Sequence, residues 1–121
     1  MGRGLVIVAV AAAALIVAGP GLAKRAPKLG ERAAITKALP ASLRNVPVGC
    51  VWLDMAVSRS GGYALVTPVY LNALHLPCLR YASNGDWILK KRPAGWRIVF
   101  HGSDAPSCSL GVPRDLVRCR P

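Results

Sequence analysis

One stretch of the chain, residues 86–102 (DWILKKRPAGWRIVFHG), constrains the fold most, because it has the pattern of a β-hairpin. Two apolar runs, WIL and WRIVF, flank the linker 92–95. Pro93 and Gly95 stand at the second and fourth positions of that linker, which suits a type I turn. The stretch therefore predicts two antiparallel strands joined by a tight turn.

The spacing within this hairpin also predicts its register. If Lys91 pairs with Trp96, the next inward-facing pairs are Leu89 with Ile98 and Trp87 with Phe100. One side of the hairpin then carries large apolar side chains, as a half-buried antiparallel sheet requires. We therefore expect the aromatic rings to belong to the core and not to a stacking platform for bases or sugars.

A second hairpin is predicted from the alternation of apolar residues over 51–57 and the apolar run 63–70. The linker 58–62 (SRSGG) is the turn. Folding about Ser60 gives a single register with these facing pairs: Val57 with Tyr63, Met55 with Leu65, Leu53 with Thr67, and Val51 with Val69. Pro68 cannot donate to a strand ladder, so its strand is expected to lie at a sheet edge there.

The segment Glu31–Leu39 is predicted to be a helix, with the acidic Glu31 in its first turn. Positions spaced as on one helical face are Ile35, Ala38, Leu39, Ser42 and Leu43, and only the serine is not apolar. Pro40 should end or kink this helix, because it lacks an N–H and crowds the preceding turn. Residues 41–45 are then expected to be a loose end.

Residues 1–23 have the pattern of a signal peptide that is cleaved after Ala23. Arg3 supplies the positive start, an apolar run follows over 5–17, and Gly21-Leu22-Ala23 is a cleavage site of small residues. A retained membrane anchor is the alternative, but the run is shorter than the roughly 20 residues that a spanning helix needs. Residues 24–30 (KRAPKLG) are expected to be a flexible leader.

The four cysteines all lie in the 98 residues that remain after such a cleavage. An even number of cysteines in a small exported domain indicates disulfides, and four cysteines allow three pairings. Proximity in the predicted hairpin and in the tail favours Cys50–Cys78 and Cys108–Cys119. We expect no metal and no cofactor.

The chain is expected to be an α+β protein with one N-terminal helix packed on a mainly antiparallel sheet of about four strands, stapled by disulfides. Residues 31–121 form this single domain, and the segment after Gly102, rich in Pro, Ser and Gly, is a loop-rich tail. A short strand over Cys78–Tyr81 and a turn over Ser83–Gly85 are expected before the last hairpin.

The chain is strongly basic, with a formal net charge of +11. Such a charge favours anionic partners, here a cell-wall polymer, a membrane surface or an acidic protein, although it also keeps a small domain soluble. No specific nucleic acid is predicted. The oligomeric state does not follow from the sequence.

The candidate anion-binding residues are Lys90, Lys91, Arg92 and Arg97. The predicted register sets Lys90 opposite Arg97, and like charges across a strand pair are unfavourable unless an anion lies between them or both side chains splay into solvent. Charged residues on strand edges also serve to prevent aggregation. Trp52 points to the other side of its hairpin from the predicted core, and we expect the tail to cover it.

Catalytic chemistry is weakly supported. His101, Ser103 and Asp104 include the residue types of a nucleophile, base and orienting group, but near neighbours on an extended chain point apart. His75 and Glu31 would serve a ribonuclease-like site only by assumption. No catalytic residue is predicted.

The order of features resembles a set of small secreted bacterial proteins, mainly actinobacterial, of unassigned function. The matching segments are ERAAI at 31–35, GWRIVF at 95–100, Gly102-Ser103, Cys108, VPRDL at 112–116 and Cys119. The resemblance implies a helix on an antiparallel sheet, similar in shape to cystatin-like and nuclear-transport-factor-like proteins. It implies no catalytic residue.

The function expected from the sequence is therefore a secreted, non-enzymatic binding domain for an anionic envelope or extracellular partner. The alternative is a secreted inhibitor of a protease or other enzyme, which would present the loop 71–77 or the tail. A small basic hydrolase or nuclease ranks last.

Overall fold

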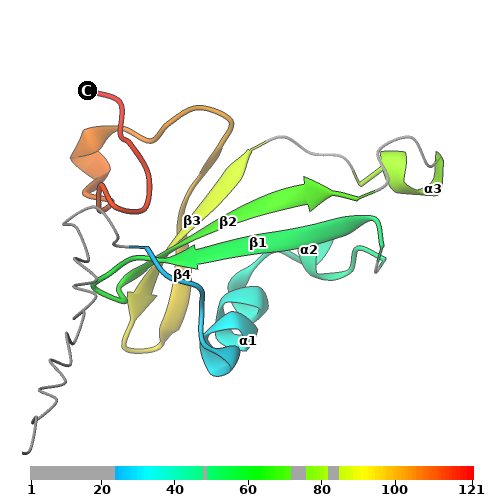
Figure 1. Ribbon diagram of the computed structural model, residues 1–121, viewed down its shortest axis with the longest axis horizontal. Helices are drawn as coiled ribbons and strands as arrows, with labels where there is room; N and C mark the ends of the chain where they lie inside the picture. Colours follow the sequence, from blue (N-terminus) through cyan, green and yellow to red (C-terminus); the bar gives the residue numbers. More distant parts are fainter. Residues whose placement is uncertain (1–23, 48, 72–75, 82–84) are drawn as a thin grey trace, which may run out of the picture.

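The computed structural model describes residues 24–47, 49–71, 76–81 and 85–121. An antiparallel sheet of four strands in the order β1-β2-β3-β4 forms its centre, with α1 and α2 on one side and the C-terminal tail on the other (Figure 1). The α+β architecture is confirmed. Its elements are α1 (Leu29–Ala38), α2 (Ala41–Arg44), β1 (Val51–Val57), β2 (Tyr63–Tyr70), α3 (Leu76–Leu79), β3 (Asp86–Arg92), β4 (Gly95–Gly102) and the 3₁₀-helix η1 (Cys108–Leu110).

The helical layer follows the predicted apolar stripe. Ile35, Leu39 and Leu43 are buried in one cluster, as the helical spacing indicated. α1 begins two residues before the predicted start and ends before Pro40. We expected residues 41–45 to be a loose end, and this prediction is wrong. The chain forms the short helix α2 there, with Pro40 at its N-cap position.

The register of the first hairpin differs by one residue from the prediction. Val57 pairs with Ala64 and Met55 with Val66, not with Tyr63 and Leu65. The turn is longer than predicted because Ser58 closes it: the Ser58 N–H donates to the Tyr63 carbonyl (2.8 Å), and the Tyr63 N–H donates to Ser58 Oγ (3.1 Å). Gly61 turns the chain inside this loop with φ +76°, a conformation that favours glycine.

Since side chains alternate along a strand, the shift exchanges the two sides of β2. We call the side that packs on α1 the inner face and the side toward the tail the outer face. The inner face holds a buried cluster of Ile35, Leu39, Leu43, Met55, Val57, Ala64, Val66 and Leu89. The outer face holds a second, smaller cluster of Ile88, Val112 and Leu116, with Tyr63, Leu65 and Phe100 packed against it.

The second hairpin keeps the predicted register only near its turn. Lys91 pairs with Trp96 and Leu89 with Ile98, as predicted. A β-bulge between Ile88 and Leu89 then shifts the pairing, so that Phe100 lies opposite Ile88 and not Trp87. The bulge adds one residue to β4 and sends the Phe100 ring to the outer face, where it joins the second cluster.

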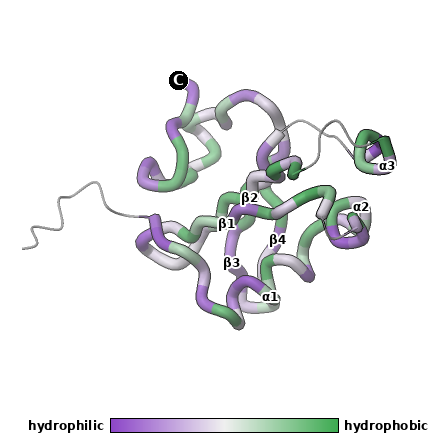
Figure 2. The backbone as a smooth tube through the Cα atoms, turned by 45° about the vertical axis from the view of Figure 1, so that its right-hand side comes forward, coloured by the Kyte–Doolittle hydropathy of each residue, from purple (hydrophilic) through white to green (hydrophobic). Residues whose placement is uncertain are grey.

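The tail after β4 packs on the outer face through its apolar residues. Figure 2 shows apolar stretches along the tail between hydrophilic ones. The predicted disulfides are both present, Cys50–Cys78 and Cys108–Cys119. In the chain-entropy model, loops of 28 and 11 residues correspond to about 3.5 and about 2.8 kcal/mol of stabilisation. Two parallel-bridge hydrogen bonds, from the Cys108 N–H to the Arg120 carbonyl and from the Arg120 N–H to the Pro106 carbonyl, close the tail loop.

One local expectation fails in the connection between the hairpins. The segment at Cys78 is the short helix α3 and not a strand, and its Cys78 is bonded to Cys50. The prediction that Pro68 lies at a sheet edge is confirmed, because β2 pairs with β3 only from Tyr63 to Val66. The predicted turn at Ser83–Gly85 lies mostly outside the described residues. Within the described ranges, none of the helices has the length and hydropathy needed to cross a membrane.

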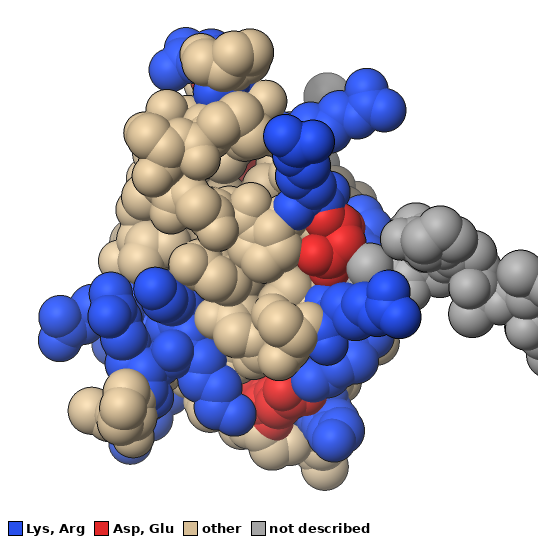
Figure 3. All heavy atoms as spheres, turned by 90° about the vertical axis from the view of Figure 1, so that its left-hand side faces the viewer, with Lys and Arg blue, Asp and Glu red and all other residues tan. Residues whose placement is uncertain are grey.

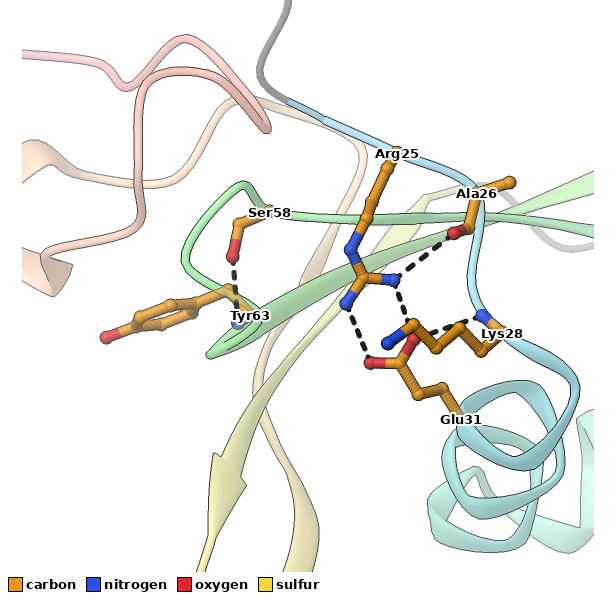
Figure 4. A network of polar contacts seen from close by, with 6 residues as sticks. All are labelled: Arg25, Ala26, Lys28, Glu31, Ser58 and Tyr63. Atoms are coloured by element: carbon orange, nitrogen blue, oxygen red, sulfur yellow. Dashed lines mark hydrogen bonds and ion pairs between the residues drawn. The ribbon is translucent and has the colours of Figure 1, made fainter.

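The predicted flexible leader is instead tied to the sheet by Arg25 (Figure 4). Its N–H donates to the Val57 carbonyl (2.8 Å), and the Val57 N–H donates to the Arg25 carbonyl (2.7 Å). Its guanidinium forms two hydrogen bonds with the Glu31 carboxylate, at 2.6 and 3.0 Å. Glu31 also accepts a hydrogen bond from the Lys28 N–H (3.0 Å), which fixes the start of α1.

This network makes the stability of the fold depend on pH. The guanidinium of Arg25, and next the Lys28 N–H, lower the pKa of Glu31 from 4.5 to about 2. The stabilisation is therefore complete above pH 4.5 and is lost as the pH falls toward 2. Glu31→Gln should lower the free energy of unfolding by about 1 kcal/mol at neutral pH, since the pair lies near the surface, and by almost nothing at pH 2. Urea unfolding across this range measures the difference.

Arg25→Gln should remove most of the same pH-dependent part of the free energy of unfolding, because the Arg25 guanidinium is the main cause of the lowered pKa of Glu31. If Glu31→Gln lowered the free energy of unfolding by the same amount at every pH from 5 down to 2, the assigned role of the ion pair would be contradicted.

Candidate anion-binding surface

The basic cluster of the β3–β4 hairpin is divided between the two faces of the sheet. Lys90 pairs directly with Arg97, as predicted, and both lie on the outer face. Arg92 lies two residues beyond Lys90 and shares that face. Lys91 points to the opposite face, and its N–H donates to the Gly62 carbonyl (2.8 Å). Three of the four predicted cations therefore stand together, and Lys91 stands apart.

Tyr63 supports one of these cations and is absent from the sequence-based site. It pairs with Lys90 across the β2–β3 ladder, and the Lys90 ammonium nitrogen lies 5.6 Å from the centre of its ring. A cation at this distance from an aromatic face is attracted by the ring electrons. The predicted register had placed Tyr63 on the inner face, so the contact was missed. The sequence feature that could have indicated the correct register is Ser58, whose side chain closes the turn.

None of these cations forms an ion pair with a carboxylate in the described part of the chain. The one ion pair there joins Arg25 and Glu31. Asp115 accepts a hydrogen bond from the Arg59 N–H (2.9 Å), and Asp86 pairs with Gly102 at the far end of the hairpin from its turn. Figure 3 shows one end of the molecule, where Lys and Arg side chains surround a neutral surface and acidic atoms are few. The outer hairpin face thus carries three cations that form no ion pair among the described residues.

The residues considered for catalysis do not converge. The His101 ring stacks on Trp87, with ring centres 3.5 Å apart and planes 8° from parallel. Ser103 and Asp104 line a small cavity of about 170 Å³ with Asp86 and Phe100, and His101 is not among its lining residues. Glu31 is engaged by Arg25. His75 lies outside the described residues.

Two further expectations for exposed segments differ from the structure or fall outside it. Trp52 is not covered by the tail but is 53% exposed, with the Arg32 guanidinium 4.5 Å from its ring centre. The tail packs further along the outer face, on Tyr63, Leu65 and Phe100. Of the loop 71–77 considered for an inhibitor, residues 72–75 lie outside the described part of the chain.

The Lys90–Arg97 pair should cost stability in the free protein. Arg97→Glu should raise the free energy of unfolding by about 0.5 kcal/mol, because a repulsive cross-strand pair becomes an attractive one. Arg92→Glu is the matched control, since Arg92 stands opposite Gly95, which has no side chain. Urea unfolding at low ionic strength compares the two, and the difference should shrink in about 1 M salt. A loss of stability in Arg97→Glu but not in Arg92→Glu would contradict the repulsion.

No protein-family model, curated protein or solved structure matches the chain. The resemblance to small secreted bacterial proteins therefore stays a prediction. The outer hairpin face is a candidate anion-binding surface because of its geometry alone.

Proposed function

We propose that this protein is a non-enzymatic binding domain that holds an anionic partner on the outer face of the β3–β4 hairpin. The observation that carries the proposal is the direct pairing of Lys90 with Arg97, neither of which forms an ion pair with a carboxylate of the described residues. Two like charges at such a position repel each other by roughly 0.2–1 kcal/mol. An anion placed between them removes this repulsion and adds two attractive contacts.

The chemistry of the three outer cations favours an extended partner with repeated negative groups. Lys90 and Arg97 are neighbours across the ladder, and Arg92 continues the row toward the turn. Arg97 and Arg92 are exposed and offer planar groups that bind carboxylate or phosphate through two hydrogen bonds. The net charge of +11 adds long-range attraction for such a partner.

The disulfides indicate an oxidising, extracytoplasmic environment, because such bonds persist outside the reducing cytosol. We infer that residues 1–23 are a signal peptide removed after Ala23. The partner is then an anionic component of the envelope or of the extracellular medium.

The binding proposal is tested with heparin as a defined polyanion. Lys90→Gln/Arg97→Gln should weaken binding about tenfold in calorimetric titrations at low salt, since two cationic contacts of somewhat under 1 kcal/mol each are lost. Raising the salt to about 0.3 M should weaken the wild type more than this variant, because exposed charges are screened.

The matched control is Lys37→Gln/Arg44→Gln, which removes the same charge from exposed positions in the helical layer. It should change heparin affinity by less than about twofold, given the modest weight of exposed charges away from the contact. Equal losses in both variants would show that only net charge matters, and the proposed site would be rejected.

The proposed export is tested by the intact mass of the protein recovered from outside the cell. The mass should correspond to residues 24–121 and should rise by four hydrogens on reduction of the two disulfides. A mass that includes residues 1–23, or free thiols before reduction, would contradict cleavage or the oxidised state.

A further inference from the structure

The first hairpin extends beyond the rest of the sheet. β3 pairs with β2 only as far as Val66, so β1 and β2 continue from there as a two-stranded ribbon (Figure 1). The ribbon comprises Val51–Asp54 and Thr67–Tyr70, which pair with each other. A ribbon of two strands buries little surface by itself. We call this ribbon, with Leu71 and α3, the arm.

A disulfide fixes α3 to the outer side of this arm. Cys50 follows the strand alternation of Trp52, so its side chain lies on the outer face, and it is bonded to Cys78 in α3. The Leu71 N–H donates to the Cys50 carbonyl (3.1 Å), which continues the ladder by one more pair. Trp52 and Val69 are direct partners in the same ladder. The strand residues and α3 therefore share one side of the arm.

This side of the arm is apolar and open. Large apolar residues exposed here are Trp52 (53%), Val69 (41%), Leu71 (54%), Leu76 (78%) and Leu79 (48%). Among the described residues, only Leu29 and Leu110 are exposed large apolar residues elsewhere. The tail covers the outer face at Ala56, Tyr63 and Leu65, in the other half of the hairpin. Several large apolar side chains exposed in one part of the fold mark an interaction site.

Cations accompany the apolar residues of the arm. The Arg32 guanidinium lies over the Trp52 ring and donates to the Leu53 carbonyl (2.7 Å), so its position is fixed. Arg80 follows α3 and lies 5.2 Å from the centre of the Tyr81 ring. Asp54 is the acidic residue on the ribbon, two ladder pairs nearer to the body than Trp52 and on the same face.

We propose that the arm docks on the surface of an anionic lipid bilayer. Leu76 and Leu79 would enter the acyl boundary, the Trp52 ring would lie at the headgroup level, and Arg32 and Arg80 would meet lipid phosphates. A second copy of the chain fits less well, because two arms would bring arginines of the same sign together on molecules that are strongly basic. The site is separate from the hairpin cations and does not depend on their function.

The test measures sedimentation of the exported, oxidised protein with vesicles of phosphatidylglycerol and phosphatidylcholine. Leu76→Ser/Leu79→Ser should lower the vesicle partition coefficient at least about tenfold, because two inserted leucines are lost. Leu29→Ser/Leu110→Ser removes the two exposed leucines that lie outside the arm, and it should change partitioning by less than about twofold. Thermal unfolding should be unchanged in both variants, since all four side chains are exposed.

Tryptophan fluorescence separates insertion from charge attraction. Vesicles should shift the emission of the wild type to the blue, and Trp52→Phe should abolish this shift, because Trp87 and Trp96 pack against the inner core. Equal binding of wild type and the Leu76→Ser/Leu79→Ser variant, without a blue shift, would overturn the proposal in favour of attraction by charge alone. Absence of vesicle binding would overturn it as well. Self-association without vesicles that this variant abolishes would assign the arm to a second copy instead.

Discussion

The turn closed by Ser58 determines how the rest of the molecule is arranged. Ser58 is fully buried, and its hydroxyl accepts the Tyr63 N–H while its own backbone pairs with the Tyr63 carbonyl. These bonds set the number of residues in the turn and therefore the register of β1 with β2. With one residue fewer, Ala64 and Val66 would leave the inner core, and Tyr63 would move away from Lys90.

Because of this register, the sheet has an apolar surface on both sides and needs two covers. The helices cover the inner face through Ile35, Leu39 and Leu43. In the described part of the chain, the outer face of the sheet body receives only the tail, whose Val112 and Leu116 form a much smaller cluster with Ile88. A loop-rich segment loses much conformational entropy on docking, and the Cys108–Cys119 bond removes part of that loss. The tail reaches only half of the outer face, which leaves the arm open.

The sequence predicts the elements better than their alignment. Helical spacing identifies the buried stripe, and alternation identifies the four strands, because each pattern is local. The Lys90–Arg97 pair is predicted correctly because it lies beside a two-residue turn, where few registers are possible. The β1–β2 register, the bulge at Ile88 and the contact of Lys90 with Tyr63 depend on side-chain bonds and packing between separate segments. Periodicity carries no information about these. The bridge between Arg25 and Val57 could not be predicted either, because Arg25 lies in a charged segment that has no strand pattern.

The outer edge of β1 illustrates a further consequence of the N-terminal network. A strand with unpaired N–H and C=O groups can recruit another chain into a growing sheet. Here the Arg25 backbone occupies both groups of Val57, and the Arg32 side chain occupies the Leu53 carbonyl. Arg25 is the second residue after the proposed cleavage position, so a peptidase that removed two residues would uncover the edge at Val57. Under the proposed cleavage, the position of the new N-terminus and the protection of this sheet edge therefore depend on the same few residues.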